Sequence, residues 1–132
     1  MRPEELRAKL KEFGKAHGLD LLILFGSHAK GTAHGGSDVD LAFWASNPVD
    51  LTELSGELIS SIHKNDIDVV DLRYCDPLVG MIALREGEVL IRKPTALGTA
   101  SSYVSRRFAD TQKFRNAMKR SLAVFLESQK KS

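Results

Sequence analysis

The stretch LFGSHAKGTAHGGSDVDL, Leu24–Leu41, decides the fold and holds the residues with the clearest chemical pattern. A short apolar run ends at Gly26 and Ser27. Ten residues later, Asp38 and Asp40 stand two positions apart at the head of a second apolar run. This spacing is typical of a site that binds a triphosphate together with a metal ion.

The apolar runs on both sides of this stretch predict strands. Leu19–Phe25 and Val39–Ala45 are too short for helices and largely apolar, as in strands that are buried on both faces. Between them, Ser27–Lys30 fits a short helical turn before a glycine. Two further strands are predicted at Ile67–Leu72 and Glu88–Ile91.

Helices are predicted between these strands. Pro3–His17 carries apolar residues at helical spacing, with proline and two acids in its first turn. A second helical periodicity begins at Leu51 and ends near Lys64, and Asp76 is the expected N-cap of a helix that continues to about Arg85. The alternation of strands and helices predicts an α/β domain, with helices packed against a small sheet.

The C-terminal part is predicted to be a linker followed by one long helix. Residues 93–102 are rich in Pro, Thr, Gly, Ala and Ser, which is the composition of a linker. In the helix, about residues 102–130, apolar residues recur at steps of three and four, and we expect that stripe to pack in the core. Its members are Val104, Phe108, Thr111, Phe114, Met118, Leu122, Phe125 and Leu126.

The composition indicates one globular domain over residues 1–132. Hydrophobic residues make up 42% of the chain and charged residues 27%, which is ordinary for a folded protein and argues against disorder. The longest apolar run is far shorter than a membrane span, and the N-terminus lacks the apolar centre of a secretory signal. We therefore expect a cytoplasmic protein with no membrane role. The single cysteine, Cys75, is expected to be a small packing residue.

Charge is distributed unevenly along the chain. Residues 1–91 carry 9 basic and 15 acidic side chains, whereas residues 92–132 carry 10 basic and 2 acidic side chains. A basic terminal segment is either the solvated face of an amphipathic helix or a surface for a polyanion or an acidic partner. The solvated face is the commoner case, so direct nucleic-acid binding is not expected, although the basic helix leaves it open.

Gly26 and Ser27 have features that suit a phosphate. Glycine permits backbone angles and a close approach that a side chain would obstruct. The serine supplies a hydroxyl beside backbone N–H groups at the start of a helical turn. The same dipeptide also occurs in many strand-to-helix turns for steric reasons alone, so the pair needs support from other residues.

The acidic residues supply that support. Residues two apart on a strand share a face, so the carboxylates of Asp38 and Asp40 can converge, and Mg²⁺ held jointly with substrate phosphates would relieve their repulsion. Asp68 lies among β-branched residues, where an unpaired charge needs a partner. If its strand lies beside that of Asp40, three carboxylates form a metal site with room for two ions. Asp71 faces the other way and is expected to cap the strand end.

Together these motifs resemble those of the nucleotidyltransferase superfamily, which includes DNA polymerase β and the kanamycin nucleotidyltransferase. The motifs are Gly26-Ser27, ten intervening residues, Asp38-x-Asp40, and Asp68 between apolar residues. Within this superfamily the chain is similar to the minimal nucleotidyltransferases, which are often paired with a HEPN-domain toxin. The resemblance covers residues 19–92 and implies a nucleotidyltransferase fold, with a small mixed β-sheet flanked by helices and a long C-terminal helix.

The resemblance also implies a mechanism. Asp38 and Asp40 would hold two Mg²⁺ ions, and Asp68 would help to bind the second ion and act as general base for an acceptor hydroxyl. Gly26 and Ser27 would hold the β- and γ-phosphates of ATP, so that pyrophosphate leaves in line. The implied acceptor is a tyrosine of a cognate HEPN toxin, and the chain would act as a type VII-like antitoxin by transferring AMP to it.

Other residues and functions remain open at this level. Lys30 and Ser37 are further candidates for binding phosphate, and His28 and His34 lie in the same loop; His28 and Lys30 stand where arginine is frequent in the family. Tyr103 and its neighbours Arg106 and Arg107 could face a nucleotide or a partner, although core and surface roles are commoner. The alternative functions are nucleotidyl transfer to a small molecule such as an aminoglycoside, and neutralisation of a partner by contact alone.

Overall fold

A computed structural model describes residues 2–33, 38–62 and 66–130 of the chain. Helices and strands alternate along most of it, as the sequence predicts. In chain order they are α1 (Pro3–Ala16), β1 (Leu21–Phe25), α2 (Ser27–Lys30), β2 (Val39–Trp44), α3 (Leu51–Ile62), β3 (Ile67–Asp71), α4 (Pro77–Glu86), β4 (Glu88–Arg92) and α5 (Ala96–Lys130).

The described strands form one mixed sheet in the order β3-β2-β1-β4. β1 pairs antiparallel with both β2 and β4, and β2 pairs parallel with β3. A parallel pair needs a crossover between its strands, and α3 supplies it. The small mixed sheet flanked by helices is therefore confirmed.

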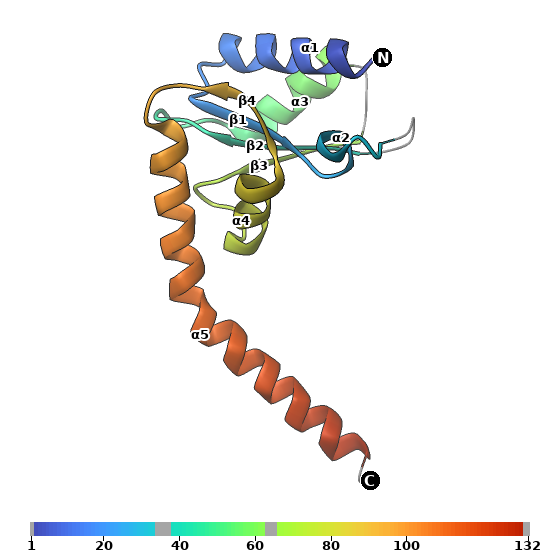
Figure 1. Cartoon of the computed structure of the whole chain (residues 1–132), viewed down its shortest axis with the longest axis vertical. Coiled ribbons are helices and arrows are strands. Elements are labelled where there is room, and N and C mark those ends of the chain that lie inside the picture. Colours follow the sequence, from blue (N-terminus) through green and yellow to red (C-terminus); the bar gives the residue numbers. More distant parts are fainter. Residues whose placement is uncertain (1, 34–37, 63–65, 131–132) are drawn as a thin grey trace.

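Helices cover both faces of the sheet (Figure 1). α1 and α3 pack on one face, where Leu10, Phe43 and Leu58 are fully buried. α4 and the first part of α5 pack on the other face, around Ile23 and Val104. Each face has its own apolar cluster because successive side chains of a strand point to opposite sides.

The predicted start of α4 is confirmed in detail. Asp76 is its N-cap, and the Asp76 carboxylate accepts a hydrogen bond of 2.9 Å from the backbone N–H of Leu78. Pro77 occupies the first helical position, where its missing N–H costs nothing. The helix that covers the second face of the sheet therefore begins where its sequence signals place it.

The prediction of a linker over residues 93–102 is wrong for most of that segment. The chain turns at Pro94 and Thr95 and enters α5 at Ala96, about six residues before the predicted start of the helix. Ala96 and Ala100 are buried against the sheet. The small residues that resemble a flexible linker are there because they let the helix approach the sheet closely.

The prediction that the apolar residues of the C-terminal helix pack in the core is wrong beyond the first turns of α5. Val104 is fully buried and Phe108 partly buried, but Phe114 is 68% exposed. The reason is length: 35 residues of helix extend about 50 Å, farther than the domain that α5 packs on. Figure 1 shows the second half of α5 leaving the body of the molecule.

None of the helices in the described ranges combines the length and the apolar composition that a membrane span requires.

Candidate active site

The turn from β1 into α2 brings the backbone close to a carboxylate. Gly26, the N-cap of α2, has φ 75° and ψ −152°, a conformation essentially restricted to glycine. A Cβ atom at this position would overlap Oδ2 of Asp40. Gly31 ends the same helical turn with φ 73°, in the left-handed region, but a Cβ there would meet open space. The backbone conformation thus requires glycine at position 26, and a side chain there would in addition displace the Asp40 carboxylate.

Strand pairing brings two of the predicted acids together. Asp40 is paired with Phe25 of β1 on one side and with Asp68 of β3 on the other. Directly paired residues point to the same face of a sheet, so both carboxylates project toward the α4 and α5 side. Asp38 is exposed immediately before β2 begins. The strand of Asp68 therefore does lie beside that of Asp40, as the site requires.

The three carboxylates interact electrostatically. Partial burial raises the pKa of the Asp40 carboxyl above its ordinary value, and the nearby charges of Asp68 and Asp38 raise it further. His28, in α2, acts in the opposite direction on the pKa of Asp40. The negative charges of all three acids thus converge on the end of β2 that follows the α2 turn.

Within the described ranges, the candidate acids Asp38, Asp40 and Asp68 are not paired with lysine or arginine side chains. Carboxylate oxygens are the ligands that Mg²⁺ prefers, so this donor set fits a divalent ion. Over the same ranges, no three acidic, histidine or cysteine side chains gather tightly enough to surround one ion. A role for all three acids as metal ligands is therefore a proposal.

The other predicted phosphate ligands are less clearly placed. The Lys30 ammonium lies 3.6 Å from the Glu86 carboxylate, an exposed ion pair that links α2 to α4. Ser27 opens α2, and its carbonyl accepts the backbone N–H of Thr32 at 3.0 Å. His34 and Ser37 lie outside the described residues.

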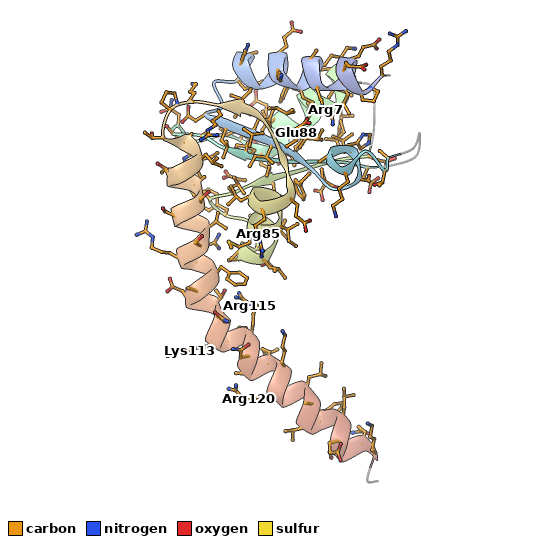
Figure 2. The ribbon with its side chains drawn as sticks, viewed as in Figure 1. Arg7, Arg85, Glu88, Lys113, Arg115 and Arg120 are labelled. Atoms are coloured by element: carbon orange, nitrogen blue, oxygen red, sulfur yellow. The ribbon has the colours of Figure 1, made fainter. Side chains whose placement is uncertain are left out.

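Sequence reasoning missed Arg7, which supports the α2 turn from α1. Its guanidinium donates to the carbonyl oxygen of His28 at 3.2 Å and pairs with the carboxylate of Glu88. Figure 2 shows Arg7 and Glu88 between α1 and the sheet. No local motif marks Arg7, because its partners are 21 and 81 residues away in the chain.

Three other residues have structural roles away from the acids. The Tyr103 hydroxyl donates to the carbonyl of Arg73 at 3.0 Å, and Arg107 donates to the carbonyls of Arg73 and Cys75. Both contacts attach α5 to the turn after β3, which gives these two side chains a structural role. The Asp71 carboxylate accepts the backbone N–H of Arg73 at 2.9 Å, which confirms its predicted role at the strand end.

Residues 8–96 match the family model described as Polymerase beta, Nucleotidyltransferase. The chain belongs to this family. The matched residues contain the α2 turn and all three acids of the candidate site, and the match ends where α5 begins. In this family member, α5 is thus an extension beyond the matched domain.

Two curated relatives are named Protein adenylyltransferase MntA. The protein from Aphanizomenon flos-aquae is 33% identical over an alignment of 88 residues, and the match covers 58% of this chain and 59% of that protein. The one from Shewanella oneidensis is 36% identical over an alignment of 75 residues, and the match covers 54% of this chain and 53% of that protein. The chain thus spans little more than half the length of the curated relatives it matches.

Solved structures show the same fold in antitoxin complexes. A toxin–antitoxin structure with AMP-PNP contains a chain with 25% identity and a TM-score of 0.77, over 89% of this chain and 98% of that one. A second structure, of a tri-AMPylated Shewanella oneidensis HEPN toxin in complex with MNT antitoxin, has a TM-score of 0.73 at 21% identity, over 92% and 99%. At that identity the second likeness concerns the fold alone.

Proposed function

We propose that this chain is a Mg²⁺-dependent adenylyltransferase that transfers AMP from ATP to a tyrosine of a cognate HEPN toxin and so acts as its antitoxin. The observation that carries this proposal is the pairing of Asp40 with Asp68 beside the Gly26 turn. Family membership, the names of the curated relatives and the toxin–antitoxin complexes among the solved structures support it.

Different residues of the site are proposed to bind the phosphates and the metal ions. The backbone at Gly26 and the hydroxyl of Ser27 bind the β- and γ-phosphates, and Lys30 can exchange its exposed pairing with Glu86 for a phosphate oxygen. Asp38 and Asp40, with Asp68 at a second position, would hold Mg²⁺, which when bound would supply positive charge to the triphosphate and lower the pKa of the acceptor hydroxyl.

The transfer step uses an acceptor from outside the chain. The tyrosine oxygen attacks the α-phosphorus of ATP, the bond from that phosphorus to the oxygen bridging it to the β-phosphorus breaks, and pyrophosphate leaves. Asp68 takes the hydroxyl proton, since it is exposed on the sheet face that an incoming protein can reach. Asp40, which is less exposed than Asp68 and is paired with it across β2 and β3, orients the reacting groups.

The test is transfer of label from α-labelled ATP to the purified cognate HEPN protein in the presence of Mg²⁺. We expect Asp38→Asn, Asp40→Asn and Asp68→Asn each to lower the rate at least about hundredfold, and chelation of Mg²⁺ to stop it. Asp71→Asn is the matched control, because Asp71 lies in the same strand as Asp68 but accepts a backbone hydrogen bond instead. It should keep most of the activity.

Two outcomes would favour the alternatives. Equal neutralisation of the toxin by an Asp38→Asn and Asp40→Asn double variant, with no label transferred by the parent protein, would replace the enzyme with a module that acts by contact. Label that appears on an aminoglycoside, and not on the HEPN protein, would identify a small-molecule transferase.

A further inference from the structure

The second half of α5 carries an apolar surface that its own domain does not cover. We call it the α5 stripe, and its side chains are all more than half exposed, with Phe114 at 68% and Leu122 at 57%. Its members are Phe114, Met118, Leu122, Phe125 and Leu126. Exposed side chains this large on one helix, with no packing partner among the described residues, are what an interaction site presents.

The α5 stripe continues a helix face that is used for packing in the first half. With about 100° between successive residues, its five members fall within an arc of about 120°. Ala96, Ala100 and Val104 fall within the same arc, and all three are buried against the domain. One face of one helix therefore packs on its own sheet at one end and is left open at the other.

The helix changes direction between these two halves, as Figure 1 shows. Near the change of direction, side chains form hydrogen bonds to backbone carbonyls of the helix in addition to the regular helical ones. The Thr111 hydroxyl donates to the carbonyls of Arg107 and Phe108, and Arg115 donates to the carbonyl of Phe108 at 2.8 Å. Side chains that bond to carbonyls of the preceding turn are a known cause of helix bending. The bend directs the α5 stripe away from the domain.

Charge identifies the kind of partner. Residues 113–130 carry five basic side chains and one acidic side chain. Figure 2 shows Lys113, Arg115 and Arg120 along the projecting part of the helix. A second copy of the chain would bring two such basic segments together, and like charges facing each other oppose association. An apolar surface edged by carboxylates complements both features of this helix.

From these observations we infer that the α5 stripe is the docking surface for the toxin that accepts AMP, which binds it through an apolar surface with an acidic edge. This inference rests on the proposed function for the identity of the partner. It assigns docking to a part of the chain beyond residue 96, where the match to the nucleotidyltransferase family ends. Binding and transfer thus belong to separate parts of the molecule.

The test compares two neutral double substitutions on the same helix. Met118→Gln with Leu122→Gln removes apolar surface from the α5 stripe, whereas Ala117→Gln with Val124→Gln changes exposed residues on the opposite side of the helix. Glutamine is a good helix former, so neither change should unfold α5. Circular dichroism and the midpoint of thermal unfolding should match those of the parent.

Affinity for the purified cognate HEPN protein is measured by calorimetry. We expect the stripe variant to bind at least about tenfold more weakly and the opposite-face variant to bind within about twofold of the parent. Lys119→Glu should also weaken binding, since its charge flanks the α5 stripe and faces the acidic edge. Equal affinity of the two double variants would overturn the inference.

The failure of this inference and that of the proposed function can be told apart. Asp40→Asn should abolish AMP transfer and leave affinity for the HEPN protein unchanged. If the parent transfers no AMP but the stripe variant binds the HEPN protein more weakly than the parent, the inferred docking surface is supported and the proposed AMP transfer is wrong. If sedimentation shows that the parent dimerises through the α5 stripe, or the stripe binds anionic vesicles or an RNA oligonucleotide instead of the HEPN protein, the inference is wrong.

Discussion

At the scale of single residues, the structure restricts the choice of amino acid at position 26 to glycine. Its backbone conformation is closed to other residues, and the space a side chain would need is occupied by Asp40. We expect Gly26→Ala to displace the Asp40 carboxylate and lower AMP transfer at least about hundredfold. It should also lower the free energy of unfolding by about 1–3 kcal/mol, measured with urea.

Gly31→Ala is the control for Gly26→Ala. Gly31 also has a positive φ, so an alanine there costs about 1–2 kcal/mol of stability, but its Cβ would meet nothing. The Gly31 variant should therefore lose stability and keep its activity. A comparable loss of transfer in both variants would mean that flexibility of the turn, and not the approach to Asp40, is what matters.

The contribution of Asp40 to the free energy of unfolding is expected to depend on pH and to be less favourable at neutral pH than at acidic pH. Its pKa is raised in the folded state, so the folded protein binds a proton more readily than the unfolded chain. Stability is then greatest below the ordinary carboxyl pKa of 3.8 and falls as the pH rises through the folded value. Without Mg²⁺, Asp40→Asn should therefore have a higher melting temperature than the parent at pH 7.

That difference should shrink as the pH approaches 3.8, where Asp40 of the parent is increasingly protonated in both states. Added Mg²⁺ should raise the melting temperature of the parent at pH 7 and have less effect on Asp40→Asn. Thermal scans with chelator and with Mg²⁺ measure both effects. An Asp40→Asn variant that is less stable than the parent in chelator at pH 7 would contradict the assigned electrostatics.

At the scale of helices and strands, the attachment of α5 depends on side chains that reach back to the turn after β3. Arg107 donates to two backbone carbonyls of that turn, whereas Arg106 is exposed and donates only within its own helix. Arg107→Ala should lower the free energy of unfolding by about 1–3 kcal/mol, and Arg106→Ala by less than about 0.5 kcal/mol. Chemical denaturation of the two neighbouring variants compares them directly; equal losses would contradict the anchoring role.

The sequence predicts the elements well where local signals agree. The N-cap at Asp76, the short apolar strands and the acid pattern around Asp40 each have a local physical cause, and all are found. The start of α5 was wrong because Ala, Gly, Ser and Thr suit both a loop and a close helix contact. Composition does not distinguish a loop from a closely packed helix. The difference depends on whether a sheet lies against these residues, and local sequence does not show that.

The roles of the site residues remain predictions, but the structure shows which of these residues lie together. Asp38, Asp40 and Gly26 are close in the chain, so their spacing could be recognised. The pairing of Asp68 with Asp40 depends on which strands are neighbours, so the apolar residues around Asp68 could only indicate that it needs a partner, without identifying that partner. Arg7 could not be found at all, because nothing in its surroundings along the chain indicates what it will contact.

At the scale of the whole molecule, the chain divides into a packed domain and a projecting helix. A chain that ends at Gln112 lacks the α5 stripe but keeps every buried residue of both apolar clusters. Its free energy of unfolding should stay within about 0.5 kcal/mol of the full chain. A chain that ends at Ser102 also lacks Tyr103, Val104 and Arg107, and should be less stable by several kcal/mol.

Thermal and urea unfolding of the two shortened chains measure this division. The amphipathic pattern of α5 predicts that the helix has an apolar partner but does not identify the partner, which is why the stripe was placed in the core. A large loss of stability in the chain that ends at Gln112 would show that the second half of α5 supports the domain after all.

The crossover that makes β2 and β3 parallel also sets the order in which the site can assemble. Gly26 and Asp40 belong to neighbouring strands joined by a short connection, whereas Asp68 can join them only after α3 has closed the longer connection. A chain emerges from the ribosome N-terminus first, so residues 67–71 become available after both Gly26 and Asp40. We therefore expect a growing chain on the ribosome to complete the group of three carboxylates only after β3 has emerged and paired with β2.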